Sequence, residues 1–141
     1  MKKTSIILPV ILVLLFAATN VSAQKPASIY CKKDMEDNRQ KECLVYGTYK
    51  TMMLPTSAHP GSPVVESSRI VIVLSDSTEL ALEVQDLGYR DEAEKEKFLG
   101  CQVLVSGTLS RWTQLWGTPE ESAIIMDAIV DIQSIELIKG R

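Results

Sequence analysis

Two stretches of β-forming residues decide the expected fold: CLVYGTYKTMM at residues 43–53 and CQVLVSGTLSRW at residues 101–112. Both are rich in side chains that favour extended backbone. Each also carries a glycine in its interior, Gly47 and Gly107, and a glycine inside a strand is typical of a bulge or a sharp bend. Because strands that bend in this way can coil around a small core, the two stretches predict the long strands of a closed sheet.

Two shorter stretches predict a hairpin after the first long strand. Residues 69–74, RIVIVL, form a continuous apolar run, and residues 79–84, ELALEV, alternate polar and apolar side chains as a half-buried strand does. The Ser-Asp-Ser sequence between them supplies the turn. Residues 54–63 contain three prolines and one glycine, which predicts a long loop before this hairpin.

A short helix and a last strand complete the pattern. Residues 91–99 begin with an Asp that is followed three positions later by a Glu, and they end before a glycine; these are the start and stop signals of a helix. Residues 123–138 are rich in isoleucine and predict a long final strand. Its apolar side chains stand at the even-numbered positions 130 and 132 and then at the odd-numbered positions 135 and 137. This change near Gln133 and Ser134 indicates a bulge.

The order of these elements is strand, strand, strand, helix, strand, strand. It predicts an all-β fold with one short helix, and more specifically a five-stranded OB-type Greek-key barrel over residues 43–141. A polar N-terminal arm at residues 24–42 would precede the barrel. A chain of 141 residues, 45% of them hydrophobic, supports one domain with one core. Another small all-β fold is the alternative.

Residues 1–23 have the three parts of a cleaved secretory signal. Lys2 and Lys3 supply a positive start, residues 6–18 are almost continuously apolar, and the small residues up to Ala23 match a signal-peptidase site. The apolar run is shorter than the roughly 20 residues that a spanning helix needs. We therefore expect cleavage after Ala23 and export to the bacterial periplasm or the extracellular medium.

The net charge argues against a nucleic-acid partner. The chain has 15 Lys and Arg against 18 Asp and Glu, and loss of Lys2 and Lys3 with the signal would lower its net charge from −3 to −5. Nucleic-acid binders usually present a basic face to the phosphates. No stretch after the signal is apolar enough to span a bilayer. The expected partner is therefore another exported protein, a peptide or a glycan.

Three cysteines would enter an oxidising compartment, where one disulfide can form and the third thiol is left over or pairs with another chain. Cys31 and Cys43 are the candidate pair, because closing the short loop between them would stabilise the fold by roughly 3 kcal/mol. Pairings with Cys101 stay open. Metal binding is the rival interpretation, but the chain has one histidine and no C-x-x-C motif, so we expect no metal and no cofactor.

Three short motifs, taken in their order, resemble those of a family of small secreted bacterial proteins of unknown function. Residues 60–67 read PGSPVVES, residues 99–109 read LGCQVLVSGTL, and Thr118-Pro119 precedes the final strand. The family carries a Pro-Gly-x-Pro-x-x-Glu-Ser loop, a Leu-Gly-Lys-x-Val-x-Val-x-Gly-Thr-Leu strand and a His-rich segment that contains Thr-Pro. The resemblance covers residues 46–138 and implies a small secreted protein, without naming a reaction.

The sequence departs from that family at two places that matter for chemistry. QLWG at residues 114–117 stands where the family has histidines, and Cys101 replaces its lysine. The resemblance therefore implies no His-based metal site and no acid–base role for this chain.

The candidate ligand face follows from the barrel prediction. OB-type barrels bind ligands across strands two and three, between the loop that joins strands one and two and the loop that joins strands four and five. Trp112 and Trp116 lie at the second of these loops. With Tyr49 they would form an aromatic platform for a sugar ring or a peptide. The alternative is that both tryptophans only cover the open end of the barrel.

Charged and titratable residues of the loops add no catalytic motif. His59 in the first loop is the only histidine, and we expect it to contact ligand or to be a solvated loop residue. General-base catalysis would need a nucleophile or water held by a third group, which no motif near His59 supplies. Glu120, Glu121, Asp127 and Asp131 lack the spacing of a calcium loop.

The sequence therefore predicts an exported binding module that is not an enzyme and that engages a protein, a peptide or a glycan through its two long loops. A hydrolase or metal-dependent enzyme on the same barrel is the first alternative. A structural or inhibitory partner of another exported protein is the second.

Overall fold

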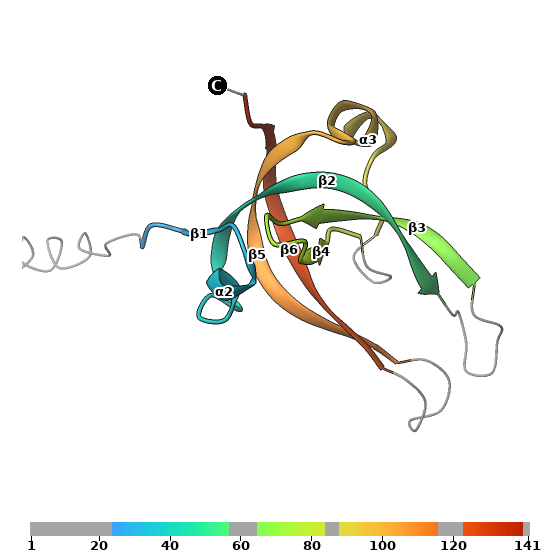
Figure 1. Cartoon of the computed structure of the whole chain (residues 1–141), viewed down its shortest axis with the longest axis horizontal. Helices are drawn as coiled ribbons and strands as arrows, with labels where there is room; N and C mark the ends of the chain where they lie inside the picture. The colour runs from blue at the N-terminus through green and yellow to red at the C-terminus, as the bar shows by residue number, and fades with distance from the viewer. Residues whose placement is uncertain (1–23, 57–64, 84–87, 116–122, 140–141) are drawn as a thin grey trace, which may run out of the picture.

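The computed structural model describes residues 24–56, 65–83, 88–115 and 123–139, and in this part of the chain the protein is mostly β-sheet with two helices (Figure 1). The elements follow in the order β1 (Ala27–Ile29), α2 (Lys32–Met35), β2 (Glu42–Thr56), β3 (Val65–Val73), β4 (Glu79–Ala81), α3 (Glu92–Phe98), β5 (Gln102–Leu115) and β6 (Ala123–Leu137).

Six strands form one mixed sheet that closes partly into a ring. β2 has two antiparallel neighbours, because its residues 42–48 pair with β5 and its residues 48–56 pair with β3. β3 also pairs with β4, and β5 with β6, again antiparallel. A single parallel pair, Ala81 with Ala128, joins β4 to β6 and so brings the two ends of the sheet together. β1 lies parallel to β2 as the sixth strand.

The predicted order of strands and helix agrees with the structure. The five predicted strands correspond to β2, β3, β4, β5 and β6, and the helix predicted at residues 91–99 is α3. β2 and β5, the first and fourth of the predicted strands, are directly paired. The prediction of a fold that is mostly β-sheet with little helix is confirmed.

Gly47 lies at a close approach of β2 to β3. A Cβ atom at this position would stand 2.5 Å from Ile72 Cγ2 and 2.6 Å from the carbonyl oxygen of Val73, so any other residue would collide with side chain and backbone. Gly47 also directly precedes Thr48, the residue at which β2 changes its partner from β5 to β3. The missing side chain therefore permits the close approach at which the sheet turns.

Gly107 faces a bulge in β6. Ser106 pairs with Ser134 and Thr108 pairs with Val130, so three residues of β6, 131–133, lie opposite Gly107 alone and β6 carries two extra residues there. A Cβ on Gly107 would stand 2.6 Å from Ile129 Cγ2. The irregularity predicted from the change of apolar parity is thus present, and the glycine makes room for it.

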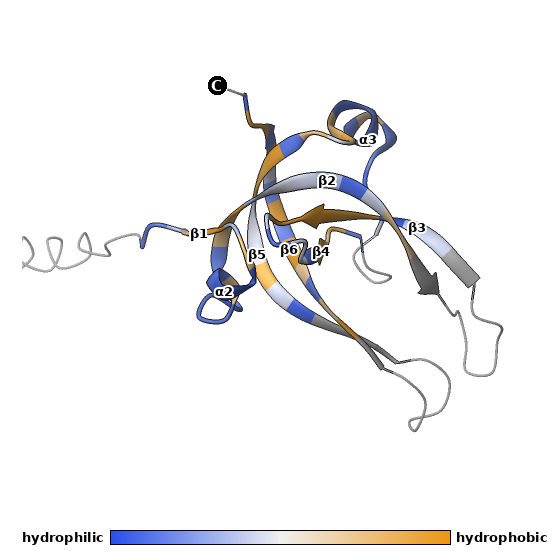
Figure 2. Cartoon of the chain, in the orientation of Figure 1, coloured by the Kyte–Doolittle hydropathy of each residue, from blue (hydrophilic) through white to orange (hydrophobic). Residues whose placement is uncertain are grey.

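The hydrophobic core fills the inside of the ring. In Figure 2 the most hydrophobic residues gather on β4 and on the part of β3 that pairs with it. The core side chains come from β1 to β6 and from both helices: Ile29, Met35, Cys43, Val45, Tyr49, Ile70, Ile72, Leu74, Leu80, Leu82, Phe98, Val103, Val105, Leu109 and Ile129.

Residues 24–42 contribute more to the fold than the expected polar arm would. Ile29 of β1 and Met35 of α2 have no exposed surface and belong to the core. Two apolar side chains among many charged ones produce no periodic pattern, so the sequence alone did not reveal this contribution.

The candidate disulfide is not formed, since all three cysteines are free thiols in the structure. Ile29 pairs with Val45, while Cys31 lies two residues after Ile29 and Cys43 two residues before Val45. At about 3.3 Å per strand residue, this offset separates the two cysteines by roughly 13 Å. Disulfide-linked Cα atoms lie within about 7 Å of each other, so the candidate pair Cys31–Cys43 is corrected.

Each member of the candidate pair has another partner. The Cys31 thiol donates to the Asp34 carboxylate at 3.4 Å, and the buried Cys43 thiol donates to the Lys41 carbonyl oxygen at 3.3 Å. Burial raises the pKa of Cys43. The thiolate form that reacts with oxidants and disulfides is thereby disfavoured at Cys43.

We predict that Gly47→Ala lowers the free energy of unfolding by at least about 2 kcal/mol, because the added methyl group collides with the backbone of β3. Urea unfolding measures the change. Ser106→Ala, in β5 and on the outer side of the sheet, should change stability by no more than about 0.5 kcal/mol. Equal stability of Gly47→Ala and the unsubstituted protein would contradict the close approach.

We predict that a thiol reagent labels Cys31 and Cys101 in the native protein and Cys43 only after unfolding, because the first two are partly exposed and the third is buried. Mass spectrometry of the labelled protein counts the modified thiols. A pair of cysteines that reacts only after chemical reduction would show that a disulfide forms after all.

Candidate functional site

The structure describes the side chain of one of the four predicted ligand-binding residues. His59 and Trp116 lie outside the described residues. Trp112 lies in β5 with its backbone opposite Met126 of β6, and its side chain is also outside what the structure describes. Tyr49 is therefore the one of the four whose side chain can be placed.

Tyr49 does not belong to an exposed aromatic platform. Its side chain is fully buried in the core, and its ring packs against Phe98 of α3 with 5.9 Å between the ring centroids. Its hydroxyl donates a hydrogen bond to Glu94 Oε1 at 3.0 Å. Because a buried ring offers no face to a ligand, the assignment of Tyr49 to the ligand face is corrected.

Glu83 is a buried carboxylate at the point where β4 has ended. It is 1% exposed. Its Oε2 accepts a hydrogen bond from the Ile70 backbone N–H at 3.1 Å, its Oε1 accepts one from the Arg90 backbone N–H at 2.6 Å, and Lys95 Nζ lies 3.4 Å from Oε1. A side chain thus satisfies a β3 backbone donor that has lost its strand partner.

Glu94 of α3 lies in the same charged cluster, which consists of Glu83, Arg90, Glu94 and Lys95. Arg90 donates to both of its carboxylate oxygens, Nε to Oε1 at 2.8 Å and Nη2 to Oε2 at 2.6 Å. Burial raises the pKa of Glu94, but the hydrogen bonds from Arg90 and Tyr49 outweigh burial and leave it below its ordinary value. Burial and the bond to Glu94 raise the pKa of Tyr49.

A cleft of about 410 Å³ lies between α3 and the strands β2 and β3, next to this cluster. It is lined by Thr51, Ser68, Ile70, Glu83, Glu92, Lys95, Glu96 and Leu99. The buried carboxylate of Glu83 is directed at two backbone donors and an ammonium group. Its bonds hold α3 and the preceding segment against the ring, which is a structural task.

A different part of the surface presents exposed aromatic side chains. Tyr30, between β1 and α2, stacks on Tyr46 of β2 with 4.5 Å between the ring centroids and 13° between the ring planes. Tyr30 remains 50% exposed. Its backbone N–H donates to Asp34 Oδ2 at 2.9 Å, and its carbonyl oxygen accepts from the Ser75 hydroxyl at 2.8 Å. Tyr30 is thus fixed at its backbone as well as at its ring.

The stacked pair borders a hollow of about 240 Å³ on the outer face of the sheet, which we call the tyrosine hollow. Its lining combines aromatic, aliphatic and uncharged polar residues: Tyr30, Tyr46, Gly47, Thr48, Val73, Leu74, Ser75 and Gln102. Gln102 Nε2 donates to Thr48 Oγ1 at 2.6 Å, so these two polar side chains hold each other in place. A rigid aromatic wall beside oriented polar groups is the composition of a small-ligand site.

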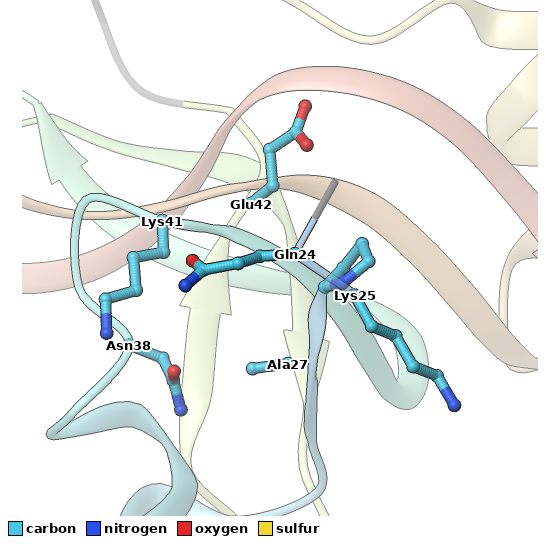
Figure 3. A pocket seen from close by; sticks show the side chains of 7 residues that line it. Gln24, Lys25, Ala27, Asn38, Lys41 and Glu42 are labelled. Atoms are coloured by element: carbon cyan, nitrogen blue, oxygen red, sulfur yellow. The ribbon is translucent and has the colours of Figure 1, made fainter. Parts of the chain in front are cut away.

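A larger hollow of about 570 Å³ lies beside β1 and the start of β2, lined by Gln24, Lys25, Pro26, Ala27, Asn38, Lys41 and Glu42. Figure 3 shows that its charged groups do not converge, since the Glu42 carboxylate and the Lys25 ammonium point away from Lys41. The Lys41 ammonium donates to the Asp37 carbonyl oxygen at 2.7 Å. Ligand sites have a few convergent polar groups, so the tyrosine hollow is the better candidate.

Sequence reasoning missed both tyrosines of the hollow. Tyr30 lies in the segment that was expected to be a solvated arm, and Tyr46 is one of several aromatic residues in a β-rich stretch. For Tyr46 a signal was available in the alternation of the strand. Neighbouring residues of a strand point to opposite faces, so Tyr46, next to the buried Val45, points outward. The meeting of the two rings had no sequence signal.

Among the described residues, no three or more His, Cys, Asp or Glu side chains are grouped so that they could hold a metal ion. Within the same residues, no helix has the length and apolar character needed to cross a membrane. A scan against protein-family models and searches of curated proteins and of solved structures find no match to the chain.

We predict that Glu94→Gln destabilises the protein by about 1–3 kcal/mol at neutral pH, because Arg90 and Tyr49 lose a charged partner. The lowered pKa of Glu94 means that its stabilising contribution is complete above the ordinary value of 4.5 and is lost as pH falls through the lower folded value. As pH falls below about 4.5, the free energy of unfolding of Glu94→Gln should therefore decrease less steeply than that of the unsubstituted protein.

Urea unfolding of both proteins at neutral pH and at about pH 3 measures this difference. Glu96→Gln, an exposed site on the same helix, serves as control and should change stability by at most about 0.5 kcal/mol at neutral pH. The same dependence on pH in Glu94→Gln and in the unsubstituted protein would contradict the role of Glu94.

Proposed function

We propose that the protein is a small exported binding module built on a five-stranded OB-type Greek-key barrel, and that it engages a protein, a peptide or a glycan. Three features support the barrel. β2 pairs with both β3 and β5, β4 and β6 are parallel neighbours, and α3 lies between β4 and β5 in the chain. An OB-type barrel is a partly open Greek-key barrel of five strands, and the single β4–β6 pair leaves this ring partly open.

The observation that carries the binding function is the tyrosine hollow. Tyr30 in this hollow is half exposed, its ring stacks on Tyr46, and its carbonyl oxygen accepts a hydrogen bond from Ser75. The polar side chains of Gln102 and Thr48, which are hydrogen-bonded to each other, line the same hollow. Large aromatic surfaces contribute contact area with little loss of side-chain freedom. A rigid exposed ring that is not needed to fill the core is well suited to a ligand.

A second contact region is proposed at the ends of the two long hairpins. In Figure 1 the paired ends of β2 and β3 and those of β5 and β6 both extend from the ring toward the lower right of the view. His59, Trp112 and Trp116 remain proposed ligand contacts there. Export to the periplasm or the medium is proposed from the residue pattern at 1–23, which is outside the described residues.

The binding function is tested by NMR titration of the ¹⁵N-labelled protein with two sets of probes, neutral monosaccharide glycosides and uncharged tripeptides. We expect saturable shifts of the amide signals of Tyr46, Thr48 and Gln102 with at least one set, because these residues line the hollow. Saturable shifts only at residues 57–64 and 116–122 would move the function to the hairpin loops. No saturable shift with either set would contradict the proposed function.

A further inference from the structure

We infer that the tyrosine hollow binds one neutral sugar ring, as a terminal or single pyranose. This inference rests on the binding function proposed above and deepens it by naming the chemical class of the ligand.

The lining of the hollow is uncharged throughout. Its residues are tyrosine, glycine, threonine, valine, leucine, serine and glutamine. Charged residues make up 23% of the chain, and the linings of both the larger hollow beside β1 and the cleft at α3 include lysine and glutamate side chains. A charged ligand would have no ionic partner here and would lose hydration on entering, so a neutral ligand is favoured.

The aromatic wall matches the geometry of a pyranose. One face of such a ring carries axial C–H groups, and these pack against the face of an aromatic ring. The Tyr30–Tyr46 stack keeps the Tyr30 ring in one orientation, while Tyr30 as a residue stays 50% exposed. Because its orientation is already set, Tyr30 loses little freedom when a sugar packs on it.

The polar groups of the hollow can both donate and accept hydrogen bonds, as sugar hydroxyls require. Gln102 uses one amide hydrogen on Thr48 and has a second hydrogen and a carbonyl oxygen, and the Thr48 hydroxyl has a hydrogen to donate. These groups stand beside the apolar side chains of Val73 and Leu74. The result is an apolar surface with a mixed donor and acceptor edge, which corresponds to the face and the rim of a sugar ring.

The size of the hollow restricts the ligand to a single ring. Its volume of about 240 Å³ is below the roughly 300–1,000 Å³ of sites that enclose drug-sized molecules. An extended peptide would occupy more length and would need backbone partners along a strand edge. A monosaccharide unit needs only the ring face and a few hydrogen bonds.

We test the inference with methyl glycosides of glucose, galactose and N-acetylglucosamine, using glucuronic acid and uncharged tripeptides as comparison probes, in the same NMR titration of the full chain. At least one neutral glycoside should produce saturable shifts at Tyr46, Thr48 and Gln102, and glucuronic acid should bind more weakly. Tyr30→Ala should weaken binding about tenfold, since it removes the stacking face.

Three further variants separate a stacking contact from a general effect on the fold. Tyr30→Phe keeps the ring and should retain most of the affinity, whereas Gln102→Ala should weaken binding without touching the stack. Tyr89→Ala is the matched control, because Tyr89 is 75% exposed and packs against Arg69 instead of the hollow. It should bind as the unsubstituted protein does.

The outcomes distinguish this inference from the proposed function. Shifts with tripeptides but with no glycoside would overturn the sugar ligand and leave the binding function in place. Glycoside binding that is unchanged in Tyr30→Ala would overturn the stacking site. Absence of binding by both probe sets would overturn the inference and the proposed function together.

Discussion

The absence of a side chain at Gly47 is the constraint on which the rest of the structure depends. At the next residue, Thr48, β2 stops pairing with β5 and starts pairing with β3, so one strand belongs to both sides of the ring. A Cβ atom on Gly47 would stand 2.5 Å from a side-chain carbon and 2.6 Å from a backbone oxygen of β3, so only glycine fits there. Gly107 likewise leaves room for a close approach, here between β5 and the bulged part of β6. Both long hairpins can therefore coil around one core.

A small charged cluster compensates for the short fourth strand. β4 contributes three residues, and its link to β6 is one residue pair. Beyond that point Glu83 provides the hydrogen-bond acceptor that a longer strand would have supplied to Ile70, and it ties the chain before α3 to the same place. Glu94 and Arg90 then attach α3 to Tyr49 of β2. Buried charge is tolerable here because each carboxylate is hydrogen-bonded and paired.

Much of the fold was predictable, and the candidate site was not. Apolar alternation, the Asp91 start of α3 and the parity change in β6 are signals that lie within one segment, and each led to the observed element. Tyr49 was assigned to the wrong environment because the residue pattern of a strand does not show which helix covers it. Tyr30 was overlooked because the charged residues around it concealed a segment that docks on β2 and on the β3–β4 turn.

The sequence by itself determined the order, type and approximate bounds of β2 to β6 and of α3, and the two positions at which a strand must bend. These properties follow from local backbone preference and from the spacing of apolar side chains. Only the tertiary structure decided that Cys31 and Cys43 stay apart, that Tyr49 is enclosed and that Tyr30 meets Tyr46. Those outcomes depend on strand register and on which surfaces face each other, and both are set by contacts between segments, which no single segment encodes.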